Sequence, residues 1–298
     1  MFFMPFLFTI KTHYNSKNKI FVYFITYIVP LFLLSFLQNF PNVRNFSFYV
    51  SFLIGLVSYV NIYEVGYIYN ECETIKKENN PTKRLSQNHL DFYENHKFVI
   101  YTERFVLTMV LNFLLLLFTS KKSIILFSTA EIISLLIFII YNNVRGKITQ
   151  FVYFFLSFFK YASIIFIHPE EFSVSVFIAA LFIFPIVRTL EYKAHYGKDS
   201  AVNVFFRKYI IKYDVSKITA FRVWATLILL CISVVLYFLK ICNLIPVICC
   251  TYIFLYRFAL FIAVKCGAKF KGYLKTDKDF SDEKGKQNAI CKEIKKKF

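Results

Sequence analysis

The chain has few of the residues that soluble enzymes use to build tight phosphate-binding turns. Among its 298 residues there are only 7 glycines and 7 prolines, and it contains no GxGxxG, Walker, HExxH or GxSxG motif. These absences exclude a Rossmann fingerprint, a P-loop, a zincin site and a nucleophile elbow. The 7 cysteines form no CxxC pair, so we expect neither a zinc site nor a disulfide framework.

Acidic residues are also scarce. The chain has 18 Asp and Glu against 36 Lys and Arg, which gives a net charge of +18. Hydrophobic residues make up 57% of the chain, and the mean hydropathy is +0.53. A soluble domain of this composition would lack the polar residues needed to cover its surface. Several apolar runs reach the length of about 20 residues that crosses a bilayer as a helix, so we predict an all-α integral membrane protein.

The apolar runs and the charged breaks between them predict eight transmembrane helices. A polar segment follows the second span and another follows the sixth, so the eight helices form two four-helix pseudo-repeats. The predicted spans are residues 20–37, 47–69, 99–118, 123–141, 148–167, 172–190, 219–239 and 243–264. They lie in a transmembrane domain of residues 20–265, with its polar loops at 70–98 and 191–218.

Lys and Arg are distributed very unevenly between the two sides of these spans. Alternate connections and the termini hold 28 of them on one side, whereas the other side holds 4. The positive-inside rule then places both termini and both polar loops in the cytoplasm, as expected for a multi-pass protein of an inner or plasma membrane. Residues 1–19 are predicted to be an interfacial N-terminal segment, and residues 266–298 a basic cytoplasmic tail attracted to anionic lipid. The tail lacks the aromatic or groove-reading elements of a nucleic-acid-binding segment.

The two polar loops begin with similarly spaced side chains. Each carries oxygen or nitrogen ligands at positions i, i+4 and i+8, which share one face of a helix. These residues are Asn70, Thr74 and Glu78 in the first segment, and Glu191, His195 and Asp199 in the second. Two such faces on opposite sides of a bundle are one way to hold divalent cations and a diphosphate.

Arginines open the spans that follow. Arg104 precedes Thr108 by four residues, and Arg222 precedes Thr226 by the same offset. Each Arg can reach phosphate oxygens, or it can be an anchor that extends to the membrane interface. Arg188 lies three residues before Glu191, so an ordinary helical ion pair competes with a substrate role.

The remaining charged residues inside the predicted spans are expected to face the interior of the bundle or a partner, because charge is costly in lipid. They are Glu64, Glu131, Lys160 and Arg257, and Glu64 is expected in the same cavity as Asn70. Pro185 is expected to kink the sixth span. Four histidines without partners at ligand spacing are expected in ordinary loops: His13, His89, His96 and His168.

This layout resembles that of the UbiA-type membrane prenyltransferases. Those proteins are helical bundles with two acidic motifs, NDxxDxxxD and DxxxD(xxxD), after the second and sixth helices, where Mg²⁺ and a diphosphate bind. Asn70, Glu71 and Glu78 match the first motif, with Thr74 at the central position and Glu73 beside it. Glu191 and Asp199 match the outer positions of the second motif, around His195. The resemblance implies catalytic roles for Asn70, Glu71, Glu78, Glu191 and Asp199, and a magnesium site made by these residues with His195.

The run Asn80-Pro-Thr-Lys83-Arg84-Leu is similar to an HPxKR element in the polyprenyl-phosphate phosphoribosyltransferase branch of that superfamily. Basic residues near the two motifs are then expected to bind substrate phosphates: Lys83, Arg84, Arg188, Lys193, Lys198, Arg104 and Arg222. For Lys83 and Arg84, a basic loop that merely follows the positive-inside rule is the other interpretation.

These observations predict a Mg²⁺-dependent membrane transferase that acts on a polyprenyl lipid and a diphosphate donor at the cytoplasmic face. Phosphoribosyl transfer from phosphoribosyl diphosphate to polyprenyl phosphate is the favoured reaction. Prenyl transfer from a prenyl diphosphate to an aromatic or other acceptor is the alternative. A non-catalytic transporter or lipid-handling protein of the same fold is a third interpretation, since the central carboxylates of the motifs are missing.

Overall fold

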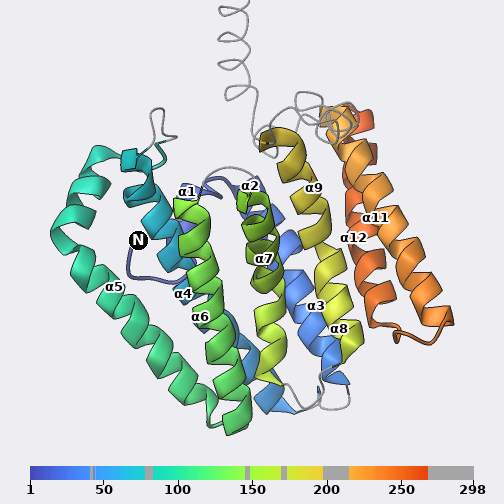
Figure 1. Ribbon diagram of the computed structural model, residues 1–298, viewed down its shortest axis with the longest axis horizontal. Coiled ribbons are helices and arrows are strands. Elements are labelled where there is room, and N and C mark those ends of the chain that lie inside the picture. The colour runs from blue at the N-terminus through green and yellow to red at the C-terminus, as the bar shows by residue number, and fades with distance from the viewer. Residues whose placement is uncertain are drawn as a thin grey trace, which may run out of the picture.

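The computed structural model describes residues 1–40, 43, 45–77, 83–144, 148–168, 173–196 and 215–267, without the side chains of 192–196 and 215. Within these ranges the chain forms helices and no strands, and successive long helices run in opposite directions (Figure 1). The protein is therefore an all-α, multi-pass membrane protein, as the sequence predicted.

The first half of the bundle contains α1 (Leu7–Thr12), α2 (Lys17–Tyr23), a π-helical turn (Phe24–Ile28), α3 (Val29–Gln38), α4 (Phe46–Cys72), a 3₁₀ turn (Thr74–Lys77), α5 (Gln87–Leu115) and α6 (Lys121–Asn143). The second half contains α7 (Ile148–Ala162), a 3₁₀ turn (Ser163–Ile167), α8 (Val174–Ile183), α9 (Pro185–Tyr196), α11 (Val215–Phe238) and α12 (Ile245–Lys265).

Joined across these turns and breaks, the described residues form 8 helices that are long and apolar enough to span a membrane, which confirms the predicted number. The largest difference from the prediction is in α5, which begins at Gln87 rather than near residue 99. At about 1.5 Å per residue, its 29 residues measure about 44 Å, so this helix is longer than a hydrocarbon core of about 30 Å. The polar first three turns of α5 were not recognised because they carry no apolar run.

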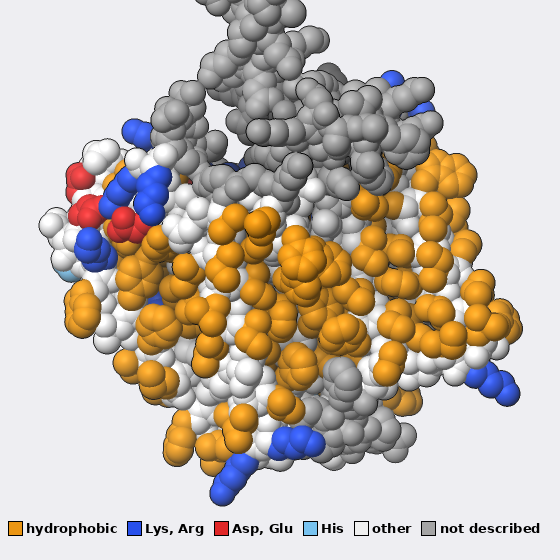
Figure 2. Space-filling model, viewed as in Figure 1, with side chains coloured by type: hydrophobic (Ala, Val, Ile, Leu, Met, Phe, Trp, Pro, Cys, Tyr) orange, Lys and Arg blue, Asp and Glu red, His pale blue; other side chains and the backbone are white. Residues whose placement is uncertain are grey.

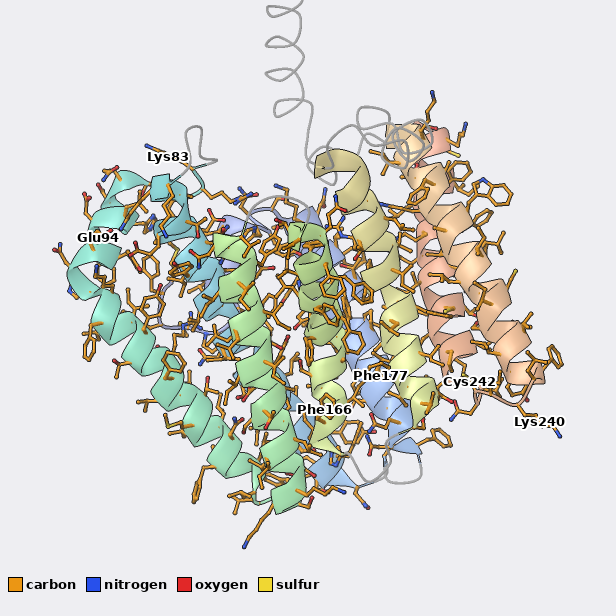
Figure 3. The ribbon with its side chains drawn as sticks, in the orientation of Figure 1. Lys83, Glu94, Phe166, Phe177, Lys240 and Cys242 are labelled. Carbon is orange, nitrogen blue, oxygen red and sulfur yellow. The ribbon has the colours of Figure 1, made fainter. Side chains whose placement is uncertain are left out.

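The surface of the bundle has the polarity of a membrane protein. Apolar side chains cover the middle of the face shown in Figure 2, and charged side chains lie near the two ends. Lys83 and Glu94 lie at one end of the bundle, and Lys240 lies at the other (Figure 3). Charge at both ends with a broad apolar band between them is the distribution expected of a bundle that crosses a bilayer.

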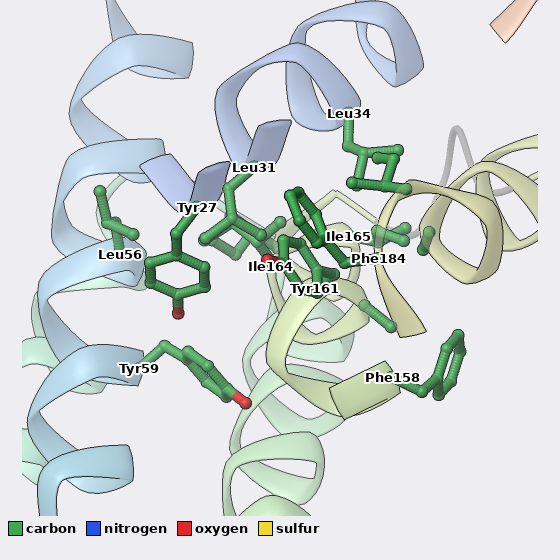
Figure 4. Close-up of a cluster of buried hydrophobic side chains, with 14 of the residues drawn as sticks. Tyr27, Leu31, Leu34, Leu56, Tyr59, Phe158, Tyr161, Ile164, Ile165 and Phe184 are labelled. Carbon is green, nitrogen blue, oxygen red and sulfur yellow. The ribbon is translucent and has the colours of Figure 1, made fainter. Parts of the chain in front are cut away.

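Inside the bundle, a proline and a π-helical turn free two carbonyl groups in the first span. Pro30 has no N–H, so the carbonyl of Thr26 loses its helical donor, and the N–H of Val29 bonds to Phe24 instead of Ile25. The hydroxyls of two tyrosines replace these donors. Tyr161 donates to the Thr26 oxygen at 2.9 Å, and Tyr252 donates to the Ile25 oxygen at 2.8 Å. These bonds tie α7 and α12 to the first span and place Tyr161 in the core (Figure 4).

The sixth span is broken at its proline, as the sequence predicted. α8 ends at Ile183, and α9 begins at Pro185, so Phe184 lies at the break with φ −140° and ψ −40°. The ring of Phe184 stacks on Tyr161 with ring centroids 5.4 Å apart. The break changes the helix direction one turn before Arg188 and thereby helps to direct this arginine.

Two helices of the first half approach each other at a glycine. A Cβ at Gly66 of α4 would lie only 2.1 Å from the ring of Phe138 in α6. The amide of Asn142 also donates to the Gly66 carbonyl at 3.2 Å. The missing side chain thus lets the Phe138 ring pack directly on the α4 backbone.

The N-terminal segment packs inside the bundle, which differs from the interfacial location that the sequence predicted. Phe2 and Phe8 are 2% and 0% exposed and pack with Ile68 and Ile100 of α4 and α5. The backbone of this segment bonds to polar groups of the same helices: the Thr9 N–H donates to Glu64 Oε1 at 2.7 Å. Sequence reasoning identified the apolar side chains but not the buried polar partners that hold them between helices.

Candidate functional site

A cavity of about 420 Å³ lies among side chains of both halves of the bundle. Its wall is basic and aromatic, and no Asp or Glu of the described residues lines it. The positively charged lining residues are Arg84, Lys160, Arg188, Arg222 and Arg257. The others are His13, Tyr14, Val22, Thr26, Tyr63, Tyr67, Asn70, Phe138, Tyr141, Tyr153, Leu156, Ser157, Tyr161 and Phe184.

The first polar segment reaches this cavity through Asn70 and Arg84. Asn70 lies in the last turn of α4, and Arg84 lies in the chain that leads to α5. Arg84 is held by the neighbouring carboxylate, because its Nη1 donates to Glu71 Oε1 at 2.5 Å. His13 Nε2 lies 3.7 Å from the same oxygen, so the N-terminal segment completes this part of the wall. His13 was expected to be an ordinary loop residue, and its place in the cavity corrects that expectation.

The second polar segment reaches the cavity through two arginines that share one carboxylate. Arg222 of α11 donates from Nε to Glu191 Oε1 at 2.6 Å and from Nη2 to Oε2 at 2.9 Å. Arg188, one helical turn before Glu191, donates from Nη1 to Oε2 at 2.8 Å. Glu191 itself is 3% exposed and does not line the cavity, whereas the two arginines bonded to it do. The helical ion pair that the sequence offered for Arg188 is present, and Arg188 also lines the cavity, while its substrate role stays a prediction.

Lys160 and Arg257 supply positive charge from two further helices, α7 and α12. Lys160 Nζ lies 4.6 Å from the ring centroid of Tyr27 and 5.5 Å from that of Tyr63. The guanidinium carbon of Arg257 lies 5.0 Å from the Phe184 ring centroid. Cation–π contacts of this kind stabilise charge in apolar surroundings by roughly 0.5–2 kcal/mol. The cost of charge in lipid predicted that both residues face the interior, but no sequence pattern linked them to the polar segments.

Several residues of the predicted site lie elsewhere or outside the described residues. α4 ends at Cys72, so Thr74 lies in a 3₁₀ turn and does not continue the helical face of Asn70. Glu73 accepts a bond from Tyr93 at 2.9 Å and pairs with Lys76, and Lys83 is exposed and does not line the cavity. The remaining predicted residues are Glu78, Lys198 and Asp199, which lie outside the described residues, and Lys193 and His195, whose side chains are not described.

Arg104, which was expected to bind substrate, lies away from this cavity. Its side chain is 0% exposed and donates to the carbonyls of Phe2 at 2.8 Å and Met4 at 3.1 Å, and to Asn61 at 2.7 Å. Its Nη1 also pairs with Glu64 Oε2 at 3.0 Å. Arg104 therefore anchors the N-terminal segment, and Glu64 belongs to that anchor rather than to the cavity that contains Asn70.

The described members of the predicted magnesium site do not fit a metal ion. Both oxygens of Glu191 accept from guanidinium groups, and Glu71 accepts from Arg84, so a metal at either carboxylate would lie beside fixed positive charge. In the part of the chain that the structure describes, no three His, Cys, Asp or Glu residues are grouped as a metal site requires. Among the described residues, five Lys and Arg line the cavity and two Glu pair with them, so the cations outnumber the carboxylates by three. The arrangement can bind an oxyanion.

Comparison with protein-family models, with curated proteins and with solved structures found no match.

Proposed function

We propose that the protein is a membrane transferase that binds the phosphate or diphosphate group of a polyprenyl substrate in the basic cavity. The observation that carries this proposal is the meeting of five cationic side chains from five separate elements in the wall of one cavity. They come from α7, α9, α11, α12 and the chain before α5. Charges inside a membrane bundle are expensive and are typically retained for a ligand or an ion pathway.

The chemistry of the wall supports a substrate that is anionic at one end and apolar elsewhere. Arg and Lys donate charge-assisted hydrogen bonds to phosphate oxygens. Tyr63, Tyr67 and Phe138 offer ring faces and apolar edges in the same cavity. A polyprenyl phosphate or diphosphate carries both chemical features, and a membrane-spanning bundle is where such a lipid is accessible.

In the proposed reaction, the bond between the donor carbon and the diphosphate oxygen breaks, and its electron pair leaves with the diphosphate. The acceptor oxygen or carbon then forms the new bond to the donor carbon, and an aromatic carbon acceptor releases its ring proton to water. Arg188, Arg222 and Lys160 stabilise the negative charge that grows on the leaving diphosphate, which is the usual role of fixed cations in such transfers. If the acceptor is a polyprenyl phosphate, its anionic oxygen attacks directly and no proton has to be removed.

Two donors remain candidates, and each is supported by a feature of the wall. A phosphoribosyl donor carries a 5-phosphate besides its diphosphate, and the number of Arg and Lys side chains supports that choice. An allylic prenyl diphosphate passes through a cation that aromatic rings stabilise, and the tyrosines around Phe138 support that alternative.

The test is a pair of parallel assays on the purified full-length chain in liposomes. One contains labelled phosphoribosyl diphosphate with polyprenyl phosphate, and the other contains a labelled prenyl diphosphate with candidate aromatic acceptors. Transfer in either assay that is lost in Arg222→Gln and kept in Lys122→Gln supports the proposal. Lys122 is the matched control because it is an exposed cation at the start of α6 and does not line the cavity. Absence of transfer from both donors would overturn the transferase proposal and favour a lipid-handling protein.

The proposed membrane orientation has its own test. The 28-to-4 distribution of Lys and Arg supports a cytoplasmic location for the end of the bundle where α5 begins. A cysteine introduced at the exposed Asn88, in a variant without the native cysteines, should resist an impermeant thiol reagent in intact cells and react after lysis. Labelling of this cysteine from outside the cell would show that the orientation is the opposite of the proposed one.

A further inference from the structure

We propose that the cavity binds phosphate oxyanions directly through its arginines and lysine, without a divalent cation, and that Glu191 positions Arg188 and Arg222. This inference rests on the proposed function only in taking a phosphate-bearing ligand for the cavity. It assigns Glu191 as a positioning residue, whereas the sequence pattern predicted a metal ligand.

The hydrogen bonds around Glu191 fix the side chains of two arginines. Arg222 binds it through two parallel N–H···O bonds of 2.6 and 2.9 Å, the bidentate arrangement that fixes a guanidinium plane. Arg188 adds a third bond of 2.8 Å to Oε2. A guanidinium group carries five N–H donors, so Glu191 uses only part of the donor set of each arginine. The carboxylate thereby fixes two cations at the cavity wall.

A similar contact holds Arg84 on the other side of the site. Its Nη1 bonds to Glu71, and Glu71 is 1% exposed, so the carboxylate lies behind the arginine that lines the cavity. Glu71 in the first polar segment and Glu191 in the second therefore each hold an arginine of the wall and do not line the cavity. A buried glutamate thus holds a cavity-lining arginine in each of the two polar segments. A single chance ion pair would not recur in this way.

Lys160 adds a cation that a carboxylate does not neutralise. Among the described residues no Asp or Glu forms an ion pair with Lys160, and its Nζ instead lies near the rings of Tyr27 and Tyr63. Among the described residues, the five Lys and Arg of the wall outnumber the paired Glu71 and Glu191 by three. A free or lipid-linked diphosphate with two to three negative charges balances this excess, whereas adding a divalent cation would increase it.

The first test uses the unmodified protein and therefore does not depend on any variant folding. Purified full-length chain is titrated calorimetrically with inorganic diphosphate in EDTA and again in excess Mg²⁺. The expected result is binding in EDTA with a Kd within about threefold of the value in Mg²⁺. Binding that appears only with Mg²⁺ would overturn the inference and would return Glu78 and Asp199 to the metal site. A parallel titration with farnesyl diphosphate distinguishes a lipid-linked ligand from a free one by its higher affinity.

Variants then separate the positioning role of Glu191 from a metal-ligand role. Glu191→Gln should keep diphosphate binding in EDTA within about tenfold, because the cations remain and one opposing charge is removed. Lys160→Gln and Arg222→Gln should each weaken binding more than tenfold, whereas Lys122→Gln should leave it unchanged. The deciding measurement is the ratio of the diphosphate Kd in Mg²⁺ to the Kd in EDTA, because loss of a purely structural contact of Glu191 would not change this ratio. A ratio far from one in wild type that Glu191→Gln abolishes would make Glu191 a metal ligand.

Failure of this inference and failure of the proposed function give different results. Diphosphate binding in EDTA without transfer from either donor would support the direct oxyanion site and overturn the transferase. Transfer accompanied by strictly Mg²⁺-dependent binding would overturn the direct oxyanion site and leave the transferase standing.

Discussion

The two halves of the bundle contain the same kind of ion pair in different surroundings. In each half, an arginine of one membrane span pairs with a glutamate of the preceding span, and a threonine four residues later bonds to the arginine carbonyl. In the first half these groups are Glu64, Arg104 and Thr108: Arg104 Nη1 lies 3.0 Å from Glu64 Oε2, and the Thr108 hydroxyl donates to the Arg104 carbonyl at 3.0 Å. In the second half they are Glu191, Arg222 and Thr226, with bonds of 2.6 to 2.9 Å. The first pair is covered, whereas the arginine of the second pair lines the cavity.

The difference comes from the N-terminal segment. In the first half its carbonyl groups at Phe2 and Met4 accept from Arg104, and its Thr9 N–H donates to Glu64. No phosphate can reach an arginine whose donors are used in this way. In the second half Arg222 bonds to Glu191 and still faces the cavity. One arrangement can thus be structural or ligand-binding, and what covers it decides which.

The largest expected effect comes from breaking the covered pair. Arg104→Ala leaves the buried Glu64 without its cation and should lower the free energy of unfolding by about 3–5 kcal/mol, the usual cost of an uncompensated buried charge. Reversible unfolding in mixed micelles measures it. The double variant Glu64→Gln with Arg104→Gln is the control and should lose less, because no charge is left unpaired. Equal losses in both variants would contradict a buried ion pair.

The next-largest effect tests the N-terminal segment that covers the Glu64–Arg104 pair. The N–H of Thr9 lies in the first turn of α1, where it has no helical acceptor, and it donates to Glu64 instead. Thr9→Pro removes this donor at a position where proline suits a helix and should cost about 1.5–3 kcal/mol, the range for a hydrogen bond to a charged group. Thr9→Ala keeps the N–H and should cost clearly less. Similar unfolding free energies for the two variants would show that the bond contributes little.

Removing the open pair should affect binding more than stability. Arg222→Ala leaves Glu191 with Arg188 and with the cavity beside it, so we expect a loss of about 1–3 kcal/mol in unfolding free energy. That is less than the loss in Arg104→Ala, measured by the same unfolding experiment. Diphosphate affinity should fall in Arg222→Ala and remain measurable in folded Glu64→Gln with Arg104→Gln. The opposite pattern would reverse the roles assigned to the two pairs.

The smallest expected difference lies between the two threonines. Thr108 Oγ1 accepts from the buried amide of Asn61 at 2.9 Å, whereas among the described residues the hydroxyl of Thr226 bonds to carbonyls of its own helix alone. Thr108→Val should therefore cost about 1 kcal/mol or more, because it removes an acceptor from a buried donor. Thr226→Val should cost less than about 0.5 kcal/mol. Matched thermal unfolding of the two variants decides whether the halves differ in this respect.

Much of the fold could be predicted from the sequence because the length and composition of an apolar run identify a membrane helix. Eight apolar runs predicted eight spans, and Pro185 predicted the break before α9. The location of Lys160 and Arg257 inside the bundle followed from the cost of charge in lipid. The polar first turns of α5 and the buried N-terminal segment were not predictable in this way, because neither depends on an apolar run of membrane length.

The candidate site was predictable only where a helix carries its residues on one continuous face. Glu191 and Arg188 lie three residues apart in one helix, so their contact follows from spacing alone. The face predicted for Asn70 and Thr74 fails because α4 ends at Cys72, between them. Spacing also predicted carboxylates that face a cavity, whereas the structure turns Glu71 and Glu191 toward arginines.

The sequence by itself determined the class of protein, the number of spans and the uneven distribution of positive charge, because these depend on local composition. Only the tertiary structure decided which arginine is covered and which lines the cavity. Arg104 and Arg222 share the spacing to a threonine four residues later, and their difference arises from a segment about 100 residues away from Arg104 that packs over one pair alone. Long-range contacts of this kind depend on helix packing, which the local pattern does not contain.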